Sequence, residues 1–235
     1  MSLDISIVIP AFNEAAKIGH DVRAAASFIA EQEMNGEVIV VDDGSQDLTA
    51  EIARQAEIPS KVKRHIIRLD SNKGKGFALK TGILESRGEI LLFADSGLCI
   101  PYSFAIPAIE WLRSDECEIA IASRLHPETE ILRNRPLKRR LLSRLFHFAA
   151  VLITGLPRSI KDSQCGFKLY RGDTARELYG ECRSTGYLFE LEIILRAMEK
   201  GYRLKQFPIR WRCDQGTRLR PMNESFAILN DGNGG

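Results

Sequence analysis

The sequence contains few cysteines and little net charge, and both shortages exclude classes of protein. Its 235 residues include five cysteines, which are scattered, odd in number and without a C-x-x-C pair. This pattern argues against a disulfide framework and against a zinc site, and it fits a reducing cytosol. The formal net charge of +2 is too small to indicate general binding to nucleic acid. We therefore expect no nucleic-acid partner.

Long apolar runs and two nucleotide-binding motifs are also missing. No eighteen consecutive apolar residues occur, so we expect no membrane-spanning helix. The first apolar run begins so near Met1 that we expect no signal peptide. No G-x-G-x-x-G follows that run, which disfavours a dinucleotide-dependent dehydrogenase, and no Walker A loop is present. The remaining composition is that of an ordinary globular domain.

Short apolar runs that alternate with helical stretches indicate the architecture. Ile5–Ile9 and Val38–Val41 have strand length and many β-branched residues, which predicts strands buried on both faces of a parallel sheet. The helical composition of Glu14–Gln32 between them completes a βαβ unit. The same alternation predicts strands over 62–69, 89–94 and 117–123, the last completing the sheet, and helices over 77–85 and 103–113. The sequence thus predicts an α/β fold with a mostly parallel sheet flanked by helices.

Polar residues follow the first two predicted strands and indicate a binding site. In an open α/β sheet, ligands lie just beyond the carboxyl ends of the strands. This places Pro10–Glu14 and Asp42–Ser45 on one edge of the sheet. A carboxylate there can accept hydrogen bonds from a ribose or a base N–H, and Gly44 lets the backbone approach the ligand. The alternative is that Asp42 and Asp43 only cap the next helix, but that role needs no polar residues on the neighbouring strand.

Two further predicted strand ends carry charge. The loop Asn72–Gly76 offers two lysines and backbone N–H groups that suit a phosphate, although a solvated turn is the alternative. Asp95 follows a very hydrophobic strand, where a carboxylate is costly to desolvate unless it is paired or bound to a cation. Because Asp95 stands at a strand tip, we favour contact with a ligand or a metal over a helix cap.

The pattern changes beyond residue 125. Asp162–Lys168 combines an acid, an amide, a glycine and a base in one predicted loop, which can orient a sugar or a phosphate or be an ordinary turn. We expect Cys165 to be a small buried side chain, because no histidine lies nearby in sequence. A helix over 189–200 and a strand over 204–211 are predicted to follow. Residues 133–153 begin cationic and become apolar, which suits a helix at an anionic membrane surface or a core helix with a solvated start.

Taken together, six motifs resemble glycosyltransferase family 2, and within it the polyprenyl-phosphate (dolichyl-phosphate) mannosyltransferases and β-glucosyltransferases. Phe189–Glu192 and Phe207–Trp211 also fit that subgroup. The resemblance covers about residues 4 to 212. The six motifs, in chain order, are Ile7–Glu14, Val40–Ser45, Asn72–Gly76, Phe93–Ser96, Ala122–Arg124 and Asp162–Lys168.

The resemblance implies a GT-A fold and an inverting transfer of a hexose from a UDP- or GDP-sugar to a polyprenyl phosphate, dolichyl or undecaprenyl. It implies a peripheral protein at the cytoplasmic face of a membrane. The implied nucleotide-sugar-binding residues are Pro10, Ala11, Glu14, Asp42, Asp43, Gly44, Ser45, Lys73, Lys75 and Asp95. The implied catalytic residues are Asp95, Arg124, Asp162 and Gln164. Residues 1–125 are expected to form the nucleotide-sugar half, 126–229 the acceptor side of the same domain, and 230–235 a flexible tail.

One departure from the family's pattern concerns the metal. The family carries an Asp-x-Asp motif for Mg²⁺ or Mn²⁺, whereas this chain has Asp95-Ser96-Gly97, with Cys99 where the mannosyltransferases have a glutamine. Neither glycine nor a thiol suits a hard cation. Asp95 is therefore the one candidate protein ligand, and weak metal dependence, altered donor choice and lost catalysis are all open.

Two alternatives for the function also stay open. The first is a family 2 transferase with another glycan or glycolipid acceptor. The second is a nucleotide-sugar-binding protein without turnover. The sequence does not indicate the oligomeric state.

Overall fold

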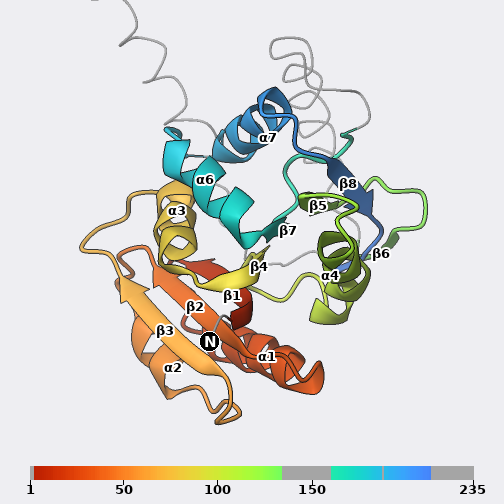
Figure 1. Cartoon of the computed structure of the whole chain (residues 1–235). Coiled ribbons are helices and arrows are strands. Elements are labelled where there is room, and N and C mark those ends of the chain that lie inside the picture. The colour runs from red at the N-terminus through yellow and green to blue at the C-terminus, as the bar shows by residue number, and fades with distance from the viewer. Residues whose placement is uncertain (1–2, 134–159, 187, 213–235) are drawn as a thin grey trace, which may run out of the picture.

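The computed structural model describes residues 3–133, 160–186 and 188–212. The strands are β1 (Leu3–Ala11), β2 (Gly36–Asp42), β3 (Lys63–Arg68), β4 (Gly88–Ala94), β5 (Ile119–Ala122), β6 (Glu130–Arg133), β7 (Phe167–Arg171), β8 (Leu204–Phe207) and β9 (Arg210–Arg212). The helices are α1 (Ile18–Glu31), α2 (Thr49–Gln55), α3 (Lys75–Glu85), the short 3₁₀ helix η1 (Tyr102–Ala105), α4 (Ile106–Arg113), α6 (Gly172–Glu181) and α7 (Phe189–Glu199). Figure 1 shows their arrangement around a central sheet.

The central sheet has the strand order β3-β2-β1-β4-β7-β5-β8, and β6 pairs with β9 in a separate small sheet. β1 lies between β2 and β4 and is parallel to both, with Ala11 opposite Asp42 at the carboxyl end. Residues of β1 alternate between two cores because successive side chains of a strand point to opposite faces. Ile7 packs in one core with residues of α1, α2 and α4, and Val8 packs in the other core with residues of α3, α6 and α7. Helices thus cover both faces of the sheet (Figure 1). The predicted α/β class is confirmed.

The sequence predicts that the strand over 117–123 completes the sheet, but two further strands join it. β7 lies between β4 and β5 and is antiparallel to both, and β8 joins the far edge of β5 in parallel. Phe167 and Leu169 fill one core and Tyr170 the other, so β7 is buried on both faces. The strand is difficult to recognise in the sequence because its second residue, Lys168, is a fully buried lysine.

Other predicted boundaries shift for local reasons. The predicted strand over 204–211 is divided into β8 and β9, and Pro208, which has no N–H to donate to a ladder, stands at the break. α6 was not expected from the sequence. The predicted basic segment 133–153, apart from Arg133, and the predicted tail 230–235 lie outside the described residues. Within the described ranges, no helix has the length and apolar character needed to cross a bilayer.

Candidate active site

The loops after β1 and β2 are joined by direct hydrogen bonds at the carboxyl edge of the sheet. Pro10 and Ala11 end β1 opposite Val41 and Asp42. The N–H of Asn13, a residue with a left-handed φ of 54°, donates to Ser45 Oγ at 2.8 Å. Nearby, the Glu14 N–H donates to Thr49 Oγ1 at 2.9 Å, and the Glu14 carboxylate pairs with Lys17 at 3.3 Å. The structure therefore brings the predicted residues of these two loops together.

Asp42 carries the most informative carboxylate of this edge. The side chain is completely buried, and its Oδ1 accepts the Ser45 N–H at 3.0 Å. The other oxygen, Oδ2, is buried without a hydrogen-bond donor among the described residues. Its charge partner is the Arg68 Nε at 3.5 Å, and the same guanidinium donates to the Ser45 carbonyl at 2.9 Å. A buried carboxylate oxygen without a donor is costly, so this atom suits a ligand N–H or O–H.

Asp43 shapes the lysine-containing loop. Its two carboxylate oxygens accept the backbone N–H groups of Lys73 at 2.7 Å and Gly74 at 2.9 Å. Burial raises the pKa of the Asp43 carboxyl, against these two hydrogen bonds, which lower it. Gly44 has a φ of 70° and lies so close to this loop that a Cβ would stand 2.5 Å from the carbonyl carbon of Ser71. Asp43 and Gly44 thus fix the position of the loop that carries the two predicted lysines.

Four charged side chains, Lys75, Asp95, Lys168 and Glu190, form a cluster that we call the lysine–carboxylate cluster. Lys75 Nζ lies 2.8 Å from Asp95 Oδ1 and 3.2 Å from Glu190 Oε1. Lys168 pairs with the other oxygen of Glu190, and both of these side chains are buried. Burial acts to lower the pKa of the Lys75 ammonium, but the charges of Asp95 and Glu190 hold it above its usual value.

The loop before β7 contributes the remaining predicted residues. Asp162 holds Arg124 in a two-point ion pair, with Nε–Oδ2 and Nη2–Oδ1 distances of 2.6 Å. Burial raises the pKa of the Asp162 carboxyl, but the Arg124 charge lowers it more, so the net shift is downward. Gln164, partly exposed, lies in the same turn. The carbonyl of Gly166 accepts the Asp95 N–H at 2.9 Å, which joins this loop to the lysine–carboxylate cluster.

Sequence reasoning missed three residues that build this edge and left a fourth without a role. Arg68 is the last residue of β3, an edge strand, and an arginine in such a position is usually interpreted as a solvent-exposed side chain. Lys168 lies in a segment that the sequence predicts to be a loop, and Asp21 lies within the predicted helical stretch Glu14–Gln32. Glu190 was noted only as part of a family motif. None of these carries a local signal, because each acquires its partner from a segment far away in the chain: Lys168 pairs with Glu190, and Asp21 accepts hydrogen bonds from residues 96 and 97.

The expected divalent cation does not fit the donor set. Gly97 offers no side chain, and its N–H and the Ser96 hydroxyl donate to the buried Asp21 carboxylate at 2.9 and 2.7 Å. Cys99 offers a thiol, which is a poor ligand for Mg²⁺ or Mn²⁺. The remaining ligand, Asp95, is already paired with an ammonium group. Among the described residues, no cluster of three or more histidine, cysteine or acidic side chains could hold a metal ion.

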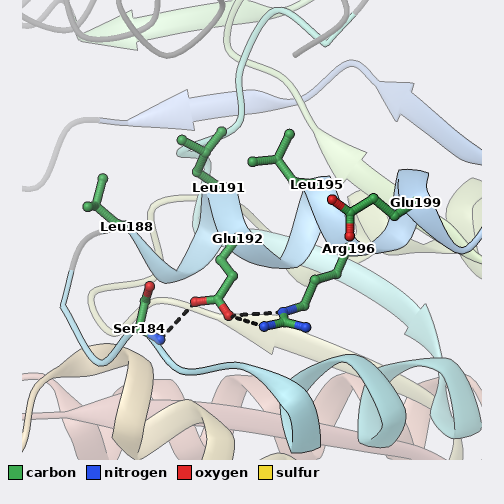
Figure 2. Close-up of a pocket in the computed structure, with 7 residues that line it drawn as sticks. All are labelled: Ser184, Leu188, Leu191, Glu192, Leu195, Arg196 and Glu199. Carbon is green, nitrogen blue, oxygen red and sulfur yellow. Dashed lines mark hydrogen bonds and ion pairs between the residues drawn. The ribbon is translucent and has the colours of Figure 1, made fainter. Parts of the chain in front are cut away.

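A separate pocket of about 310 Å³ lies beside α7, and none of the predicted site residues lines it (Figure 2). Two of its charged side chains, Glu192 and Arg196, already have partners within the protein. Glu192 accepts the Ser184 N–H at 2.8 Å and pairs with Arg196 at 2.8 Å. Apolar side chains cover much of the rest. The lining residues are Ser184, Leu188, Leu191, Glu192, Leu195, Arg196 and Glu199. We therefore place the candidate active site at the sheet edge and not in this pocket.

The mostly parallel sheet, with its joined loops at the carboxyl edge, has the arrangement expected of a GT-A nucleotide-sugar transferase fold, and solved structures of that kind match it. The sequence profile described as Glycosyl transferase family 2 matches residues 6–178. The chain belongs to this family and is a glycosyltransferase, as the sequence motifs predicted.

Two curated relatives are dolichyl-phosphate beta-glucosyltransferases. The protein from Drosophila melanogaster is 34% identical over 235 residues, covering 94% of this chain and 70% of the relative. The protein from Saccharomyces cerevisiae is 32% identical over 243 residues, covering 97% and 72%. A solved structure, glucosyl-3-phosphoglycerate synthase from Mycobacterium tuberculosis with Mn²⁺ and UDP-glucose, matches with a TM-score of 0.64 at 19% identity, covering 92% of this chain and 73% of that one. This last match shows the shared fold.

Proposed function

We propose that this glycosyltransferase transfers a hexose, with glucose as the first candidate, from a nucleotide sugar to a polyprenyl phosphate with inversion at the anomeric carbon. The observation that carries the proposal is that the loops after β1, β2, β3 and β4 are joined to one another at one sheet edge. There, a buried Asp42 oxygen that receives no hydrogen bond from the residues the structure describes lies on the same edge as the cations Lys75 and Arg124. Four relatives carry the name dolichyl-phosphate beta-glucosyltransferase. Their names support glucose as the transferred hexose and a lipid phosphate as the acceptor.

The state of Asp42 favours UDP over GDP as the carrier. Oδ1 accepts the Ser45 N–H, whereas Oδ2 receives no hydrogen bond within the described part of the chain. Uracil presents a single ring N–H to such an acceptor, whereas guanine presents two neighbouring N–H groups that suit both oxygens of a free carboxylate. In this proposal Pro10, Ala11 and Glu14 line the same nucleoside subsite.

The chemistry needs little acid–base catalysis. A phosphate monoester is already anionic at neutral pH, so an acceptor oxygen can attack the anomeric carbon without a strong general base. Catalysis then depends on alignment and on stabilising the charge of the leaving diphosphate. We assign this stabilisation to the positive charges of Lys75 and Arg124. Asp162 holds Arg124 in a fixed orientation. Gln164 is proposed to contact the acceptor phosphate or the sugar.

Two further parts of the proposal follow from the substrates. Because the acceptor is a lipid, we propose that the protein works peripherally at the cytoplasmic face of a membrane. Residues 1–125 would hold the donor and residues 126–229 would face the acceptor.

The proposal is tested by incubating the full chain with labelled UDP-glucose or GDP-mannose. Dolichyl phosphate, undecaprenyl phosphate and soluble glycans serve as parallel acceptors. We expect label in the lipid fraction with UDP-glucose. Label only in soluble glycans would assign another acceptor, and donor binding without transfer would make the chain a binding protein.

A further inference from the structure

Lys75 presents its positive charge at the candidate active site. It is the first residue of α3, and its ammonium lies 2.8 Å from Asp95 Oδ1. The Lys75 side chain is 30% exposed and that of Asp95 is 42% exposed, so a ligand can reach both. The ammonium also lies 5.0 Å from the ring centre of Phe93 and 5.8 Å from that of Phe189. These rings favour a cation at this point.

A buried ion pair keeps the Lys75 ammonium in this place. Glu190, 4% exposed, binds Lys75 with one oxygen and Lys168, 1% exposed, with the other. The lysine–carboxylate cluster then contains two ammonium groups and two carboxylates and is neutral. Asp95 and Glu190 thus stabilise the positive charge of the Lys75 ammonium at the edge of the site.

A second cation would be poorly accommodated beside Asp95. An ion bound to an Asp95 oxygen would stand next to the Lys75 ammonium, and like charges repel strongly at such distances in a partly desolvated site. The other Asp95 oxygen faces Gly166 so closely that a Cβ there would lie 1.9 Å away. Gly97, with a φ of 102°, brings no second carboxylate that would offset this repulsion.

We infer that the Lys75 ammonium supplies, at Asp95, the positive charge that a divalent cation supplies in relatives with a complete Asp-x-Asp motif, so that sugar transfer here needs no metal ion. The inference rests on the proposed function and deepens it. The bond between the anomeric carbon and the donor's β-phosphate oxygen breaks, and its electron pair goes to that oxygen. A new bond forms from the acceptor phosphate oxygen to the anomeric carbon. Lys75 remains protonated throughout and stabilises the diphosphate that leaves.

The test compares transfer rates of the full chain in EDTA, in Mg²⁺ and in Mn²⁺. We expect the wild-type rate in EDTA to stay within about threefold of the rate with metal. Lys75→Met should lower kcat by about 100-fold in all three buffers, as removal of one charge-stabilising donor does in other active sites. Lys75→Arg, which keeps the charge, should recover part of that loss in each buffer. Lys63→Met, at an exposed lysine that begins β3, is the matched control and should keep the wild-type rate.

The outcomes separate this inference from the proposed function. Transfer that EDTA abolishes and Mn²⁺ restores would overturn the inference and leave the function standing. The inference would also be overturned if Lys75→Met melted at the wild-type temperature and kept the wild-type transfer rate with Mn²⁺. No transfer from any donor to any lipid phosphate, in any buffer, would overturn the proposed function and the inference with it.

Discussion

Removal of the Glu190 carboxylate should destabilise the protein strongly. Glu190→Ala leaves the Lys168 ammonium, which is 1% exposed, without its carboxylate partner, and it removes one of the two acids that hold Lys75. Breaking a buried pair by removing one partner typically costs about 3 to 5 kcal/mol, since the remaining charge stays desolvated. For a chain of this length, we expect the melting temperature to fall by about 6 to 20 °C.

The measurement is a urea titration followed by circular dichroism, with Glu199→Ala as the matched control. Glu199 is an exposed residue on the same helix, α7, so its loss should change the free energy of unfolding by less than about 0.5 kcal/mol. The double variant Lys168→Met/Glu190→Ala removes both charges. We expect its cost to be smaller than the sum of the single variants by about 1 kcal/mol or more. A cost below about 1 kcal/mol for Glu190→Ala, or strict additivity in the cycle, would refute the reasoning.

Three other variants test the site and the fold. Asp42→Ala should abolish the thermal shift that UDP-glucose produces, and an unchanged shift would contradict the nucleoside placement. Gly166→Ala should displace Asp95 and lower kcat about tenfold, whereas Gly180→Ala, with space around it, should not; equal rates would argue against the contact. Burial raises the pKa of Glu192, but hydrogen bonds from Ser184, Arg183 and Arg196 lower it to about 2, so its stabilisation is present above pH 4.5 and lost as the pH falls towards 2. Between pH 5 and pH 3 the urea midpoint of the wild type should therefore fall more than that of Glu192→Gln. An equal fall in both proteins would contradict this role of Glu192.

The first half of the fold could be predicted from the sequence because its signals are local. β1, β2 and β4 are rich in apolar residues and almost entirely buried, since helices cover both faces of the sheet. The rule that ligands lie beyond the carboxyl ends of parallel strands then placed the loops after β1, β2, β3 and β4 at one edge. Hydrogen bonds between those loops agree with that arrangement.

The rest depended on contacts that no local pattern reveals. Lys168 is tolerated inside a buried strand because Glu190, 22 residues later, neutralises it, so the strand reads as a charged loop. The pair of Arg124 with Asp162 also joins two segments, 38 residues apart in the sequence. Likewise, the contact of Gly166 with Asp95 crosses two segments that are adjacent only in the folded chain.

The antiparallel β7 has a consequence for any attempt to treat the protein as exchangeable modules. Residues that come late in the chain fill the middle of the sheet, between β4 and β5. A fragment ending near residue 125 would leave the backbone of β4 unpaired along one side, and such an edge invites intermolecular association. Grafting the C-terminal half of another transferase onto this N-terminal half would therefore have to reproduce the register of Phe167–Arg171, and not only the loops that meet the substrate.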